Sequence, residues 1–165
     1  MERFDEEGKL IMPEPEVLKK ELEHLGLYYD NAVHVHQVFC PNGHQLILDN
    51  NNKFNDMPGI KLLLAGIRGS SEVFISPYLN KRERSGGDMF KLGDRLEVRC
   101  PICSVELPII APCDCQWDGM YVTLSLEEDM STKNAVCFCN IWGCPNGDVR
   151  LAGEVITEYR SNYSL

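Results

Sequence analysis

The chain has 165 residues, 44% of them hydrophobic and 25% charged, so it can bury a globular core. This composition excludes a wholly disordered chain, a collagen-like repeat and a coiled coil, and the longest apolar runs are too short to cross a bilayer. Asp and Glu outnumber Lys and Arg by 25 to 16, and the resulting net charge of −9 disfavours general binding to phosphate backbones.

The N-terminal residues 1–30 are expected to form a polar tail and a short helix. No basic start followed by an apolar stretch is present, so we expect no secretory signal and a cytoplasmic location. The sequence predicts an amphipathic helix over residues 15–25, because its leucines at spacing i, i+4 and i+7 share one face. Gly26 stands where a glycine commonly ends a helix.

Residues 31–165 are expected to form a β-rich, metal-binding domain with an inserted loop region around 50–95. Short segments rich in Val, Ile and aromatic residues alternate with Gly, Pro, Asn and Asp, a pattern typical of antiparallel strands. The predicted strands cover residues 32–39, 45–48, 60–67, 72–75, 95–99, 105–110, 120–126, 135–141 and 150–159. The predicted fold class is therefore mainly β with a short N-terminal helix.

Two short motifs predict a first metal site. Cys40 and His44 flank a Pro-Asn-Gly turn, and Cys100 and Cys103 flank a Pro-Ile turn. Each turn directs two ligands inward from one corner and leaves backbone N–H groups free to donate to the sulfurs. Two such corners facing each other give a tetrahedral site of three cysteines and one histidine.

These two corners resemble the knuckles of the zinc-ribbon class, in which the tips of two β-hairpins clamp one Zn(II). The resemblance covers the knuckles and the strands that flank them. It implies antiparallel strands organised around the knuckles. A long segment separates His44 from Cys100, which an inserted subdomain explains.

Five further thiols are candidates for a second four-coordinate site. They belong to Cys113, Cys115, Cys137, Cys139 and Cys144. Residues i and i+2 of a strand share one face, so each Cys-x-Cys pair can present both thiols to one ion. We favour Cys113, Cys115 and Cys139 together with Cys144, or with Cys137 in place of one of them. The sequence leaves this choice open, and one thiol is spare.

The predicted cofactor is Zn(II), one or two per chain. In a reducing compartment, eight cysteines at these spacings serve as metal ligands rather than disulfides. Iron or an iron–sulfur cluster is the alternative, which His44 makes less favourable.

The tetrapeptide Cys-Pro-Asn-Gly occurs twice, at residues 40–43 and 144–147. Four residues are too few to indicate a duplication. They indicate the same kind of tight turn built twice, with the glycine free to adopt positive φ.

Other residues have both a structural and a functional interpretation. His34 and His36 are expected on a polar strand face, with an open catalytic zinc site as the alternative. The basic run 81–84 is expected in a solvated loop, with anion binding as the alternative. Trp117 and Trp142 are expected to pack over the metal core, with partner binding as the alternative.

The sequence lacks the phosphate-binding, dinucleotide-binding and metalloprotease motifs. The predicted function is therefore a non-catalytic zinc-binding scaffold or interaction protein, a small subunit or accessory factor of a larger complex. The expected partner is a protein, not nucleic acid or a membrane, and an enzyme is disfavoured. The alternatives are an iron or iron–sulfur electron-transfer protein and a zinc-ribbon nucleic-acid-binding protein that uses basic residues 81–99.

Overall fold

A computed structural model describes residues 6, 23–29, 33–48, 53–79, 83–129 and 131–159 of the chain. These residues form antiparallel strands arranged in two larger sheets and two short hairpins. The prediction of a mainly β, antiparallel fold is confirmed. No helix within these residues is long and apolar enough to cross a membrane.

The predicted helix over residues 15–25 is corrected by the structure. The elements of the described chain are all strands: only Glu23 and His24 have helical backbone, and residues 15–22 lie outside the described part. Of the predicted helix, residues 23–25 are described. There the N–H of Gly26 donates to the carbonyl of Glu23, which closes a single turn. The chain is already extended at Leu27, where the first strand begins. Of the three leucines behind the prediction, Leu25 lies in this turn, and Leu18 and Leu22 lie outside the described residues.

The first larger sheet has the strand order β7-β6-β5-β8. Its strands are β5 (Ile60–Gly66), β6 (Gly69–Ile75), β7 (Arg84–Ser85) and β8 (Glu97–Arg99). The two short hairpins precede it along the chain. They pair β1 (Leu27–Tyr29) with β2 (Val33–Val35), and β3 (Lys53–Phe54) with β4 (Met57–Pro58).

The second larger sheet has the strand order β13-β12-β11-β10-β9. Its strands are β9 (Ile109–Pro112), β10 (Met120–Ser125), β11 (Ala135–Cys139), β12 (Gly147–Leu151) and β13 (Glu154–Tyr159). The sequence predicted one strand over residues 150–159, whereas the structure has two. Ala152 and Gly153 both have positive φ, 52° and 83°, and form the tight turn that reverses the chain.

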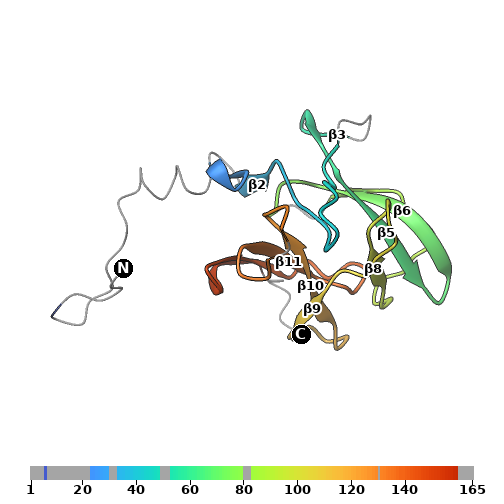
Figure 1. Cartoon of the computed structure of the whole chain (residues 1–165). Helices are drawn as coiled ribbons and strands as arrows, with labels where there is room; N and C mark the ends of the chain where they lie inside the picture. Colours follow the sequence, from blue (N-terminus) through green and yellow to red (C-terminus); the bar gives the residue numbers. More distant parts are fainter. Residues whose placement is uncertain are drawn as a thin grey trace.

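A common core lies between the two larger sheets (Figure 1). In β5 the buried and half-buried residues alternate, so Ile60, Leu62 and Leu64 point to the same side. The second sheet contributes Val122 and Leu124 from β10 and further side chains from β11 and β12. Full burial of each such side chain contributes about 1.5–3 kcal/mol to folding. The described strands of the predicted insert around 50–95 thus form one wall of this core.

Backbone hydrogen bonds join the two sheets into a closed ring. The 38–46 hairpin links them on one side: Phe39 exchanges hydrogen bonds with Ser125 of β10, and the N–H of Lys61 in β5 donates to Leu46. The 98–108 segment links them on the other side: Leu107 donates to Val98, and Thr123 donates to Pro108. Each linking segment turns at a tip that carries cysteines.

Candidate metal centres

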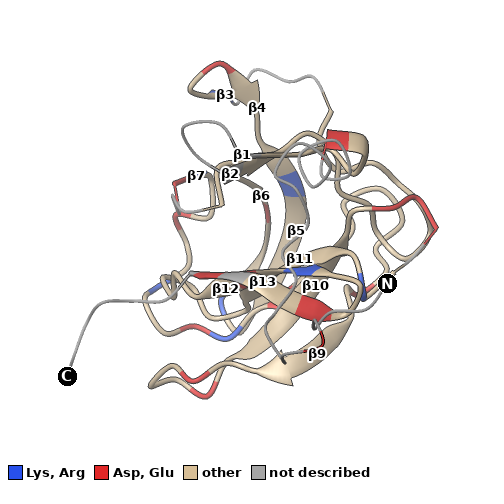
Figure 2. Ribbon diagram, turned by 90° about the vertical axis from the view of Figure 1, so that its left-hand side faces the viewer, with Lys and Arg blue, Asp and Glu red and all other residues tan. Residues whose placement is uncertain are grey.

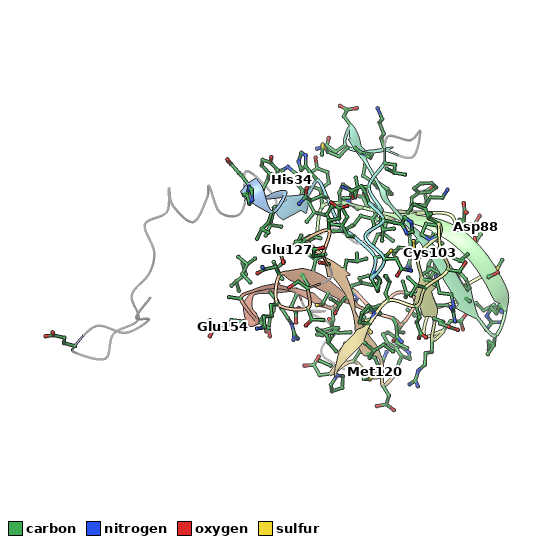
Figure 3. The ribbon with its side chains drawn as sticks, viewed as in Figure 1. His34, Asp88, Cys103, Met120, Glu127 and Glu154 are labelled. Atoms are coloured by element: carbon green, nitrogen blue, oxygen red, sulfur yellow. The ribbon has the colours of Figure 1, made fainter. Side chains whose placement is uncertain are left out.

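The tips of the two linking hairpins bring Cys40, His44, Cys100 and Cys103 together. We call this group cluster 1; all four ligand atoms lie within 4.8 Å of one another. The first tip is held by the Cys40 N–H, which donates to the His44 carbonyl, and by the Gly43 N–H, which donates to the Cys40 carbonyl. The second is held by the Cys100 N–H, which donates to Val105. Figure 3 labels Cys103 at this junction.

The distances within cluster 1 match tetrahedral coordination. At a Zn–S bond of about 2.3 Å, a tetrahedron places two sulfurs about 3.8 Å apart. Sγ of Cys40 lies 3.9 Å from Sγ of Cys103 and 3.4 Å from Nδ1 of His44, and Sγ of Cys100 lies 3.9 Å from the same nitrogen. These separations are those expected of ligands that share one ion.

A second group, cluster 2, consists of Cys113, Cys115, Cys139 and Cys144, with all four sulfurs again within 4.8 Å. Cys113 and Cys115 follow the end of β9, Cys139 ends β11, and Cys144 lies in the turn before β12. The sulfurs of Cys113 and Cys144 are 4.0 Å apart, and those of Cys115 and Cys139 are 3.9 Å apart. These distances also match a tetrahedron of thiolates.

Cys137 does not join cluster 2, although it shares a strand face with Cys139. Residues i and i+2 of an extended strand are about 6.6 Å apart, farther than two thiolates on one ion. Cys113 and Cys115 approach each other because the chain has left the strand there. Cys137 instead pairs across the sheet with Thr123 and Asp148, and its sulfur lies 3.7 Å from the Thr123 hydroxyl.

The two occurrences of Cys-Pro-Asn-Gly have the same role in the two clusters. Nδ2 of Asn42 donates to Sγ of Cys103 over 3.3 Å, and Nδ2 of Asn146 donates to Sγ of Cys113 over 3.3 Å. In each case the asparagine lies two residues after one ligand and bonds a ligand from another segment. Hydrogen bonds from such supporting residues orient metal ligands and stabilise thiolate charge. Sequence reasoning missed both asparagines, although the repeated tetrapeptide contained the signal.

Backbone N–H groups also point at the sulfurs of cluster 1. The N–H of Asn42 donates to Sγ of Cys40 over 3.3 Å, and that of Ile102 donates to Sγ of Cys100 over 3.4 Å. Burial raises the pKa of Cys100 to about 11. Burial also raises the pKa of Cys103, but hydrogen bonds from the Val105 N–H, the Asn42 amide and neighbouring side chains outweigh it and lower the pKa to about 6.

Cluster 2 has the same division between a stabilised thiolate and protonated thiols. A hydrogen bond from Cys139, together with the N–H of Asn146, lowers the pKa of Cys144 to about 6. The hydrogen bond to Cys144, followed by burial, raises the pKa of Cys139. Burial also raises the pKa of Cys113. A cation in the cluster favours the thiolate form of every ligand, so binding releases protons.

Cys137 has different neighbours from the clustered thiols. Burial, and next the negative charge of Asp148, raise its pKa to about 12. Its side chain is 3% exposed and lies beside the Asp148–Arg150 ion pair. The pKa values of Cys100, Cys113 and Cys139 are also raised, so Cys137 is set apart by its position outside both clusters and not by its protonation.

Clusters 1 and 2 are the groups of three or more potential metal ligands among the described residues. The other residues considered in the sequence lie outside them. The rings of His34 and His36 pack against each other and against Tyr28, and His34 also packs against Tyr78. Lys81 and Arg82 lie outside the described residues.

The two tryptophans are both half-buried. Trp117 packs against the residues around cluster 2, and Trp142 packs against the common core. All eight cysteines are free thiols.

No protein-family model matches the chain, and neither a curated protein nor a solved structure matches it. The chemistry of the two clusters is therefore the main indication of function.

Gly119 provides a steric test of cluster 2. A Cβ atom at this position would overlap Sγ of Cys139 and lie 3.2 Å from Sγ of Cys115. We expect Gly119→Ala to reduce bound metal from two ions to one per chain, measured by elemental analysis. The matched control is Gly153→Ala, which is also strained at φ +83° but meets its nearest atom only at 3.9 Å. Two ions in Gly119→Ala would contradict cluster 2 as a metal site.

The asparagine amides provide an electrostatic test. We expect Asn42→Ala and Asn146→Ala each to weaken metal retention at one of the two sites by about 10–100-fold, because each loses a donor to a ligand sulfur. Competition with a chromophoric chelator measures this. Asn55→Ala is the control, since its amide contacts the Tyr78 hydroxyl instead. Release curves identical to this control would show that the amides do not support the ligands.

Proposed function

We propose that the chain is a non-catalytic zinc-binding scaffold that serves as an interaction subunit of a larger complex. The observation that carries this proposal is the pair of complete four-ligand clusters. Each offers four cysteine or histidine atoms within 4.8 Å, as closed structural zinc sites do. Catalytic zinc sites instead combine three protein ligands with an open position for water.

Zinc suits both ligand sets. Cluster 1 combines three thiolates with one imidazole, a set typical of structural zinc. Cluster 2 has four thiolates, which suit zinc and also a single iron. The mixed sulfur and nitrogen ligands of cluster 1 favour zinc. Because an asparagine amide supports a ligand sulfur in each cluster, we expect the same metal in cluster 2. Iron-based electron transfer is the competing function that metal analysis distinguishes.

The clusters lie where a crosslink contributes most to the fold. Cluster 1 ties together the two hairpin tips that link the sheets, and cluster 2 ties the end of β9 to the β11–β12 turn. The binding free energy of a structural zinc ion is folding free energy, because the site does not exist in the unfolded chain.

Metal analysis and chelation test the scaffold. We expect two zinc ions and no iron per chain after anaerobic purification, and loss of cooperative unfolding after chelation. Cys139→Ala should bind one ion, whereas Cys137→Ala should still bind two. Bound iron with visible absorbance would contradict the zinc scaffold and support electron transfer instead. An unchanged melting curve in confirmed metal-free protein would contradict a structural role of the metal.

One end of the molecule exposes a group of large apolar side chains that we call the hairpin-tip patch. Ile67, at the β5–β6 turn, is 92% exposed, Leu92 is 69% exposed and Met89 is 42% exposed. An ion pair of 2.8 Å between Arg68 and Asp94 ties the turn to the loop that carries Met89 and Leu92. Figure 3 labels Asp88 in this loop. Exposed apolar groups of this kind are typical of protein interfaces.

Charge supports a protein partner over nucleic acid. Acidic positions outnumber basic ones along the ribbon, in agreement with the net charge of −9 (Figure 2). Several of the described bases of segment 81–99 are already engaged: Arg95 donates to the Asp118 carbonyl, and Arg99 donates to the Ser104 carbonyl and pairs with Glu97.

The hairpin-tip patch provides the test of the interaction role. We expect the native protein to co-purify with a defined partner at modest salt, and Ile67→Asp with Leu92→Asp to abolish this without loss of zinc. Ile109→Asp is the control, since Ile109 is also exposed but lies on β9. The proposed interface would be contradicted if the native protein were recovered only as a free monomer. It would also be contradicted if Ile109→Asp lost the partner to the same extent.

A further inference from the structure

A cavity of about 140 Å³ lies between the two larger sheets. Its walls include the half-buried apolar residues Ile75, Leu79 and Phe138, and behind them lie core residues of both sheets such as Leu62 and Leu124. Protein interiors are close-packed, with few voids larger than a water molecule. An apolar cavity of about 150 Å³ is large enough to hold a benzene-sized molecule. This space is therefore large enough for a small organic ligand.

One end of the cavity reaches exposed charged residues. Its lining continues from the core through the buried Ser76 and the half-buried Trp142 to Glu83 and Arg84. Arg84 and Glu83 are exposed, so this end forms the mouth.

The mouth is held in place by contacts around Trp142. The guanidinium of Arg84 stacks on the indole, with Cζ 3.7 Å from the ring centroid. The ring of Phe90 lies 5.2 Å from the indole. The backbone of Trp142 is fixed by its N–H, which donates to Asp94, and by its carbonyl, which accepts from Gly93. Trp142 thus positions Arg84 at the mouth.

The guanidinium of Arg84 differs from those of the other described arginines. Those of Arg68, Arg95, Arg99 and Arg150 each donate to a carboxylate or carbonyl oxygen. No oxygen among the described residues accepts a hydrogen bond from the Arg84 guanidinium. Partial burial lowers its pKa, with no opposing negative charge among the causes. Its donors are available for an anion from solution.

We propose that this cavity is a binding site for a small apolar carboxylate, whose hydrocarbon part enters the space between the sheets while its carboxylate pairs with Arg84. The two carboxylates of the lining do not oppose this. Asp148 is 3% exposed and is neutralised by Arg150, with Nη2 and Oδ2 3.0 Å apart. Glu83 is exposed, so its charge is screened by solvent.

Calorimetric titration of the full-length, metal-loaded protein with four probes tests the proposal. Hexanoate has both the chain and the charge, hexanamide lacks the charge, acetate lacks the chain, and phenylacetate replaces the chain by a ring. We expect hexanoate and phenylacetate to bind at least about tenfold more tightly than hexanamide or acetate, since a charge-assisted hydrogen bond and apolar burial both contribute.

Variants separate the two contributions. Arg84→Gln should reduce hexanoate affinity about tenfold, to the level of hexanamide, whereas Lys133→Gln should bind as the native protein does because it removes an equal charge on the β10–β11 connection. Ile75→Phe, which narrows the cavity, should weaken hexanoate and hexanamide alike. The proposal would be overturned if hexanoate did not bind, or if acetate bound as tightly as hexanoate. It would also be overturned if Arg84→Gln and Lys133→Gln lost hexanoate affinity equally.

Discussion

Closure of the hydrogen-bonded ring at its two hairpin tips is the constraint on which this fold depends. The 38–46 hairpin meets β10 and β5 through only a few backbone hydrogen bonds, and β8 meets residues 105–107 in a similarly short ladder. Cys40 and Cys100 are completely buried where these tips meet. Four ligand atoms converge at this point and could hold a cation, which would balance the charge of buried thiolates. A metal crosslink there would add stability that short ladders do not provide.

The second cluster repeats this arrangement in a different part of the fold. Cluster 2 uses a loop after β9 and a turn before β12, not two linking hairpins, yet the Asn146 amide contacts Cys113 as the Asn42 amide contacts Cys103. The similarity is confined to the Cys-Pro-Asn residues and the hydrogen bonds of their asparagines. Gly43 has a φ of +81° and turns the chain, whereas Gly147 begins strand β12 without a positive φ, so the expectation of the same tight turn built twice is wrong for the second copy.

Cluster 2 and the inter-sheet cavity share one stretch of chain. Residues 140–143 connect the ligands Cys139 and Cys144, and this connection carries Trp142, which supports Arg84 at the mouth of the cavity. The same connection bonds to β8 through the Leu96 N–H and the Asn140 carbonyl. A metal ion in cluster 2 would therefore restrain one wall of the cavity and link the stability of the scaffold to the shape of the proposed binding site.

The sequence by itself determined the β class, most strand positions and the eight cysteines and one histidine as candidate ligands, because these follow from side-chain alternation and from short turn motifs. It did not determine which of the five C-terminal thiols lies outside cluster 2. In the structure that thiol is Cys137, which stands opposite Asp148 on β12, two residues before Cys139 along β11. Nor did it show that strands between His44 and Cys100 form a wall of the core, or that Arg84 stacks on Trp142. These depend on contacts between segments far apart in the chain, which local patterns do not encode.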